Sequence, residues 1–161
     1  MKKTLFISFT ILLGIILDIM PLGKYLALFR PYWTLMIVIF WALYLRNSFG
    51  IGSAWLAGLI LDISKNYLLG AHGFIFALTA YLIKRNYHWL RELSIVEQSL
   101  LVVSLFAFQG LAVIVMNGFL NIPNVHVALA AIPIILSSIL WPLLSGLLSE
   151  LSFMLQIDEK K

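Results

Sequence analysis

The chain has 161 residues, of which 62% are hydrophobic and only 11% are charged, and its mean hydropathy is +1.01. A soluble domain averages about 25% charged residues, so these charges are too few to cover a surface that faces water. The composition therefore predicts an integral membrane protein made almost entirely of apolar helices. The net charge of +4 comes from short segments between apolar runs, which does not indicate nucleic-acid binding. The absence of cysteine excludes disulfides and thiolate metal sites.

The N-terminal segment has the outline of a signal peptide. Lys2 and Lys3 precede an apolar run from Leu5 to Leu17. A cleavable signal has small residues at a cleavage site after its apolar run, and the sequence Asp18-Ile19-Met20-Pro21-Leu22 offers none. We expect this segment to be retained as the first helix.

Apolar runs predict six helices in a single transmembrane domain that covers residues 1–161. Their approximate ranges are 4–20, 31–45, 48–63, 67–83, 97–120 and 127–152. A crossing needs about 20 apolar residues, so a chain of this length has room for five or six. The second and third helices are short, because 15 residues at about 1.5 Å each span about 22 Å. A re-entrant hairpin is therefore an alternative to two full crossings.

The distribution of basic residues favours six crossings. If the N-terminus is inside, six helices place eight Lys and Arg residues on the inner side and three on the outer side. The inner set is Lys2, Lys3, Arg46, Lys84, Arg85, Arg91, Lys160 and Lys161, and the outer set is Lys24, Arg30 and Lys65. An excess of positive charge marks the cytoplasmic side of membrane proteins. We therefore expect a multi-pass protein with both termini in the cytoplasm.

Small residues spaced by four would allow close contact between helices. The pairs are Ala54 with Gly58, Gly73 with Ala77, and Ser145 with Ser149. Packing within the bundle is the favoured interpretation. The alternative is that one pair faces outward and binds another membrane protein or a second copy of the chain. No internal repeat is apparent.

Asp18, Asp62 and Arg30 are expected at similar depth near the outer side. Ionisable groups inside a membrane are costly and are often functional. An arginine can bond a carboxylate with two parallel hydrogen bonds, so we expect Arg30 to pair with these carboxylates and to join three helix ends. The cluster is either a structural ion pair or a polar pocket for a ligand or partner. Whether it encloses a cavity, for example for a lipid-linked precursor, is left open.

No pattern in the sequence predicts catalysis or a cofactor. Glu150, near the inner end of the last helix, is within reach of water or a basic loop. His72 and His126 are isolated, whereas a zinc site would need several ligands at matched spacing. We therefore predict a protein that is not an enzyme and holds no metal.

Several motifs, taken together, resemble the rod shape-determining protein MreD family. They are Phe29-Arg30-Pro31-Tyr32-Trp33 before the second helix, Gly58-x-x-x-Asp62 at the end of the third, and Trp141-Pro142 in the last. The resemblance covers nearly the whole chain. One departure is Tyr32, where the family is expected to have Asn or Asp.

The resemblance implies a non-catalytic scaffold of the cell-elongation machinery in the bacterial inner membrane. It implies direct binding of MreC, and through it a link to MreB and to the glycosyltransferase and transpeptidase of peptidoglycan synthesis. Arg30, Pro31, Trp33 and Asp62 would shape the outer rim that meets a partner. It also implies a fold similar to the substrate-binding subunit of energy-coupling-factor transporters. A subunit of such a vitamin transporter is the alternative function.

Overall fold

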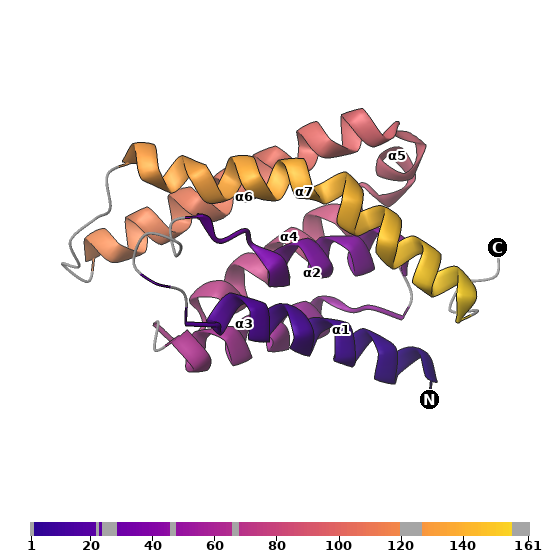
Figure 1. Ribbon diagram of the computed structural model, residues 1–161, viewed down its shortest axis with the longest axis horizontal. Coiled ribbons are helices and arrows are strands. Elements are labelled where there is room, and N and C mark those ends of the chain that lie inside the picture. Colours follow the sequence, from indigo (N-terminus) through magenta and orange to yellow (C-terminus); the bar gives the residue numbers. More distant parts are fainter. Residues whose placement is uncertain are drawn as a thin grey trace.

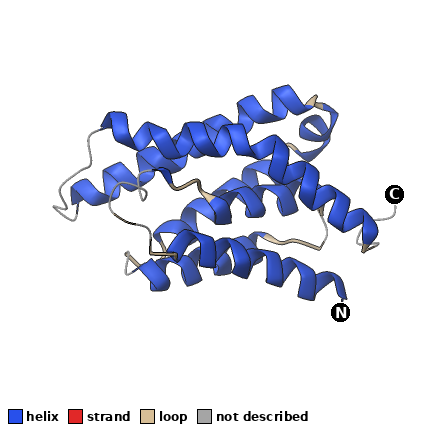
Figure 2. Cartoon of the chain, in the orientation of Figure 1, coloured by secondary structure: helices blue, strands red, loops and turns tan. Residues whose placement is uncertain are grey.

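Helices account for all regular structure in the described part of the chain (Figure 2). The computed structural model describes residues 2–21, 23, 29–45, 48–65, 68–119 and 127–155. Within these ranges there are seven helices: α1 (Lys2–Ile19), α2 (Trp33–Tyr44), α3 (Ile51–Lys65), α4 (Ala71–Arg85), α5 (Tyr87–Glu92), α6 (Ile95–Phe119) and α7 (Val127–Met154). Six of them match the predicted helices to within a few residues. The short α5 was not predicted and lies in the basic segment between the fourth and fifth predicted helices.

Helix α2 forms the centre of the bundle and contacts α1, α4, α5 and α7 (Figure 1). All residues from Thr34 to Ala42 are buried, and a helix that is apolar on every side is a core helix. The indole Nε1 of Trp41 donates a hydrogen bond of 2.9 Å to Thr10 Oγ1 of α1. This bond satisfies a polar group that would otherwise be unpaired in the core. It also joins the middle of α1 to the last turn of α2.

Helices α6 and α7 present apolar side chains to the outside. Residues 96–115 and 131–154 are long and apolar enough to cross a membrane, the two stretches among the described residues that meet this criterion. Only 28% and 17% of these stretches are buried, whereas the core helix of a soluble protein would be mostly buried. Exposed leucines such as Leu111, Leu143 and Leu147 would form a large apolar patch in water. This outward surface is compatible with a membrane protein.

The two ends of the bundle differ in the segments that they carry. The first turn of α1, helix α5 and the last turn of α7 lie at one end (Figure 1). Lys84 and Arg85, at the end of α4, adjoin α5. Of the basic residues that supported the predicted topology, Lys24, Arg46, Lys160 and Lys161 lie outside the described residues.

Helices α3 and α4 have the most extensive contact of any pair of described helices. A Cβ atom on Gly58 would lie 2.5 Å from the Cα and N atoms of Gly73, so the two backbones touch. Ala54 is buried beside them and Ala77 is half-buried. These four small residues serve packing within the bundle, which was the favoured interpretation of their spacing.

The third pair of small residues, Ser145 with Ser149, behaves differently. Both side chains are half-buried on α7. Their hydroxyls donate to carbonyls of their own helix, to Pro142 at 3.1 Å and Gly146 at 2.8 Å. A Cβ atom on Gly146 would meet nothing within 4 Å. This face of α7 therefore carries small side chains, its hydroxyls are hydrogen-bonded within the helix, and the space beside Gly146 is open.

We predict that Gly58→Ala lowers the free energy of unfolding by about 3 kcal/mol, the upper end of the usual cost of overpacking. The added methyl would meet backbone, which cannot rotate away, so α3 and α4 must separate. SDS titration in mixed micelles, followed by tryptophan fluorescence, measures the change. Gly52→Ala is the matched control, because a Cβ there meets nothing within 4 Å. Equal stability of the two variants would contradict the contact.

Candidate functional site

Asp62 is fully buried near the end of α3 and caps the N-terminus of α4. Its carboxylate accepts hydrogen bonds from the backbone N–H groups of Gly70 at 3.0 Å, His72 at 3.1 Å and Gly73 at 3.3 Å. The Nδ1 atom of the buried His72 lies 2.7 Å from Asp62 Oδ1. The first N–H groups of a helix have no partner within the helix and carry partial positive charge. The buried carboxylate therefore accepts the hydrogen bonds that the buried start of α4 donates. The side chain of His72 also has its hydrogen-bond partner in Asp62.

The turn into α4 depends on Gly70. This residue has a φ of +93° and immediately precedes the helix. Side chains other than glycine are strained in this region of φ. Glycine therefore permits the tight turn that aims the N–H groups of residues 70, 72 and 73 at the carboxylate.

Asp18 caps α2 in the same manner. It lies near the end of α1 and is 3% exposed. Its Oδ2 accepts a hydrogen bond from the backbone N–H of Thr34 at 2.9 Å and a short one from the Thr34 hydroxyl. A second cap reaches α2 from α7, where Ser137 Oγ accepts the N–H of Tyr32 at 2.8 Å. The start of the central helix is thereby bonded to both α1 and α7.

The two capped hairpins repeat one local sequence. Residues 14–19 read GIILDI and residues 58–63 read GLILDI. In each, the glycine lies one turn before the aspartate, on the same helix face. A Cβ atom on Gly14 would lie 3.2 Å from Thr34 Cα, and one on Gly58 would lie 2.5 Å from the carbonyl carbon of His72. Glycine lets the next helix start come close, and aspartate bonds to it. The expectation of no internal repeat was therefore wrong.

The repeat extends to the residue that the aspartate binds. Thr34 and His72 are each the second residue of the following helix. Each offers the carboxylate a backbone N–H and a side-chain group. The Gly-x-x-x-Asp motif therefore joins two consecutive helices into a hairpin, and the chain contains it twice.

Arg30 does not pair with either carboxylate, so the predicted ion pair is wrong. Its two terminal nitrogens donate to the backbone carbonyls of Asp18 and Met20, and both hydrogen bonds are short. The last carbonyls of a helix have no hydrogen-bond donor within the helix. Arg30 supplies these donors at the end of α1. Hydrogen bonds from the starts of α2 and α4 hold the two carboxylates instead.

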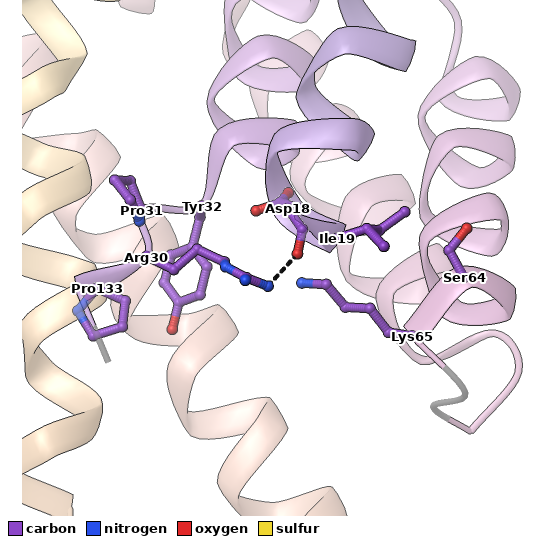
Figure 3. Close-up of a pocket in the computed structure, with 8 residues that line it drawn as sticks. All are labelled: Asp18, Ile19, Arg30, Pro31, Tyr32, Ser64, Lys65 and Pro133. Atoms are coloured by element: carbon purple, nitrogen blue, oxygen red, sulfur yellow. Dashed lines mark hydrogen bonds between the residues drawn. The ribbon is translucent and has the colours of Figure 1, made fainter. Parts of the chain in front are cut away.

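A rim pocket of about 430 Å³ lies beside this arginine (Figure 3). Arg30 and Lys65 extend into it from opposite sides, with Asp18 between them. It is lined by Asp18, Ile19, Arg30, Pro31, Tyr32, Ser64, Lys65 and Pro133. The pocket lies between the ends of α1 and α3, the segment before α2, and α7. The sequence left open whether the polar residues at this end enclose a cavity, and in the structure Asp18 and Arg30 line this pocket.

The structure divides the predicted site residues among three places. Asp18, Arg30 and Pro31 line the rim pocket. Trp33, the first residue of α2, lines a separate apolar groove. Asp62 lines neither space and is enclosed between α3 and α4. Glu150 is exposed, and His126 lies outside the described residues.

The described polar groups do not form a metal-binding cluster of three or more His, Asp or Glu residues. Instead, the buried carboxylates and the arginine bond to helix ends. The site can hold helices in place and can offer positive charge to a ligand in the rim pocket.

Sequence reasoning missed Thr34, Ser137 and Lys65. The repeated GIILDI and GLILDI segments were a usable signal for Thr34, because they imply that Asp18 has the same kind of partner as Asp62. Ser137 is 105 residues from its partner Tyr32, and no local pattern identifies it. Lys65 was assigned to the outer loop and not to the site.

We predict that Asp62→Ala lowers the free energy of unfolding by about 3 kcal/mol, since it removes a cap and leaves buried N–H groups unpaired. Asp62→Asn retains an acceptor and should cost less. The same SDS titration measures both. Glu150→Ala removes an exposed carboxylate and should change the value by less than about 0.5 kcal/mol. A loss no larger for Asp62→Ala than for this control would contradict the capping role.

Two comparisons with known proteins identify the same family. Residues 1–151 match the family described as rod shape-determining protein MreD. The chain is 33% identical over 142 residues to the rod shape-determining protein MreD of Haemophilus influenzae, an alignment that covers 83% of this chain and 85% of that protein. No solved structure matches the chain.

Proposed function

The chain belongs to the rod shape-determining protein MreD family and has a role in cell shape, and we propose that it is a non-catalytic scaffold of the bacterial cell-elongation complex. In this role it binds MreC directly in the inner membrane. Through MreC it is linked to MreB and to the enzymes of peptidoglycan synthesis. The match over residues 1–151 carries the proposal, because it reaches all seven described helices and includes both Gly-x-x-x-Asp motifs.

The proposed arrangement in the membrane is six crossings with both termini in the cytoplasm. The start of α1 and the end of α7 lie at one end of the bundle, which an even number of crossings requires. Lys3, Lys84 and Arg85 belong to segments at that end, in keeping with an excess of positive charge inside. Helices α2, α3 and α4 are shorter than a full crossing, and α2 is enclosed by protein rather than lipid.

The distribution of polar groups favours a scaffold over an enzyme. Asp18, Asp62 and His72 are buried and bonded to helix starts. Groups engaged in this way fix the positions of the helix starts. A rigid rim and an apolar outer surface suit a protein whose partners meet it within the bilayer.

The open face of α7 is the proposed contact for the transmembrane helix of MreC. Pro142, Ser145, Gly146 and Ser149 recur at the i, i+3, i+4 and i+7 positions of one helix face. The hydroxyls are satisfied within α7, so a partner helix need not supply hydrogen bonds. Small residues let helix backbones approach closely, which is how helices associate in lipid.

The topology predicts which residues a membrane-impermeant maleimide reaches. The chain has no cysteine, so single-cysteine variants report on one position each. In cells with an intact inner membrane and a permeable outer membrane, Lys65→Cys should be labelled. Lys84→Cys should be labelled only after the inner membrane is opened. The reverse pattern, or equal labelling, would contradict both termini being cytoplasmic.

The docking face predicts that Gly146→Leu reduces co-purification of MreC from mild detergent roughly tenfold, equivalent to about 1.4 kcal/mol of lost packing. The leucine would hold the partner helix away from α7. Quantitative mass spectrometry of the eluate measures the ratio of MreC to this chain. Recovery of an ATP-binding transporter module in place of MreC would favour the vitamin-transporter alternative.

Gly52→Leu is the matched control for this experiment. Gly52 is also an exposed helical glycine, on α3, and a Cβ there meets nothing within 4 Å. Its variant should retain MreC. Equal loss in both variants would mean that added bulk anywhere disturbs the complex, and full retention in both would remove α7 as the contact.

A further inference from the structure

The rim pocket holds more positive charge than its surroundings neutralise. The Lys65 ammonium makes no hydrogen bond and no ion pair with any described residue. Arg30 bonds only to neutral carbonyls, and its Nε is buried without an acceptor among the described residues. Asp18 is the one carboxylate that lines the pocket, and Thr34 occupies its Oδ2. One carboxylate against two cations leaves this pocket able to take a second acceptor with negative charge.

An apolar groove of about 250 Å³ lies next to the rim pocket, on the other side of the start of α2. It runs between α1 and α7 over α2, and its lining includes Leu13, Leu17, Ile37, Leu140 and Leu144. Adjacent residues line the two spaces. Leu17 and Trp33 line the groove, whereas Asp18 and Tyr32 line the pocket. The polar, cationic pocket and the apolar groove therefore border each other at the end of α1 and the start of α2.

We propose that the pocket and the groove together bind an anionic phospholipid of the surrounding membrane. Its phosphate lies against Lys65 and Arg30, and one acyl chain lies in the groove between α1 and α7. Charged phosphate oxygens accept hydrogen bonds from lysine and arginine more strongly than neutral acceptors do. The hydrocarbon chain contacts the leucines of α1 and α7.

Charge next to the groove favours a lipid over a partner helix. The groove is lined almost entirely by apolar side chains and borders a pocket with two cations at the start of α2. An anionic head group joined to an acyl chain matches this combination. Free phosphate would satisfy the cations and leave the groove empty.

The lipid site does not depend on MreC binding. Groove residues Leu140, Leu143, Leu144 and Leu147 lie on a different face of α7 from Ser145 and Ser149. The two surfaces can therefore be altered separately.

The test uses the full-length protein in detergent, with dioleoyl phosphatidylglycerol and dioleoyl phosphatidylcholine as probes. Native mass spectrometry counts the bound lipid, and the melting temperature is followed against lipid concentration. Phosphatidylglycerol should bind and raise the melting temperature, and phosphatidylcholine should not. Lys65→Gln should weaken phosphatidylglycerol binding roughly tenfold, the loss expected for one charge-assisted hydrogen bond. Lys65→Arg keeps the charge and should restore binding.

A second pair of variants tests the groove. Leu147→Trp fills it and should also weaken phosphatidylglycerol binding, whereas Leu111→Trp, at an exposed leucine of α6, should not. Equal binding of the two lipids, or unchanged binding in Lys65→Gln, would overturn the proposal. An equal melting shift with inorganic phosphate alone would show that only an anion is recognised. A protein crosslinked in membranes to Leu143→Cys would show that a partner helix, not lipid, covers the groove.

Discussion

Two buried carboxylates, each bonded to the start of a neighbouring helix, are the interactions on which the rest of this bundle depends. A carboxylate without partners is very costly in an apolar interior, and so is a helix start with unpaired N–H groups. Asp18 and Asp62 solve both problems at once. The glycine one turn earlier is part of the same device, because the hydrogen bonds form only if the next helix start comes close.

The other features of the rim follow from this arrangement. Because the carboxylates bond to helix starts, Arg30 bonds to the end carbonyls of α1, which carry no formal charge. Since α2 is held by Asp18 and by Ser137 of α7, its first turn separates the rim pocket from the apolar groove. Positive charge therefore persists at this end of the bundle and borders an apolar surface.

The helices could be predicted from sequence because length and hydropathy alone determine them. Apolar runs in a chain with so few charges must form helices, which satisfy every backbone group internally, and six ranges were found to within a few residues. Asp18, Asp62 and Arg30 were also identified, because charge inside apolar helices is conspicuous. Their partners were not, since a carboxylate is satisfied equally by a guanidinium or by N–H groups. The choice depends on how closely two helices approach, and at Ser137 on a contact across 105 residues.

The twofold use of the Gly-x-x-x-Asp hairpin bears on how the chain enters the membrane during synthesis. Helix α2 ends before α3 is made, and α1 with α2 already contains both the carboxylate and its donors. The same is true of α3 with α4. Each hairpin can shield its own aspartate from hydrocarbon before later helices exist. Each pair of helices therefore supplies the partners of its own aspartate, and Ser137 of α7 adds a later contact at the start of α2.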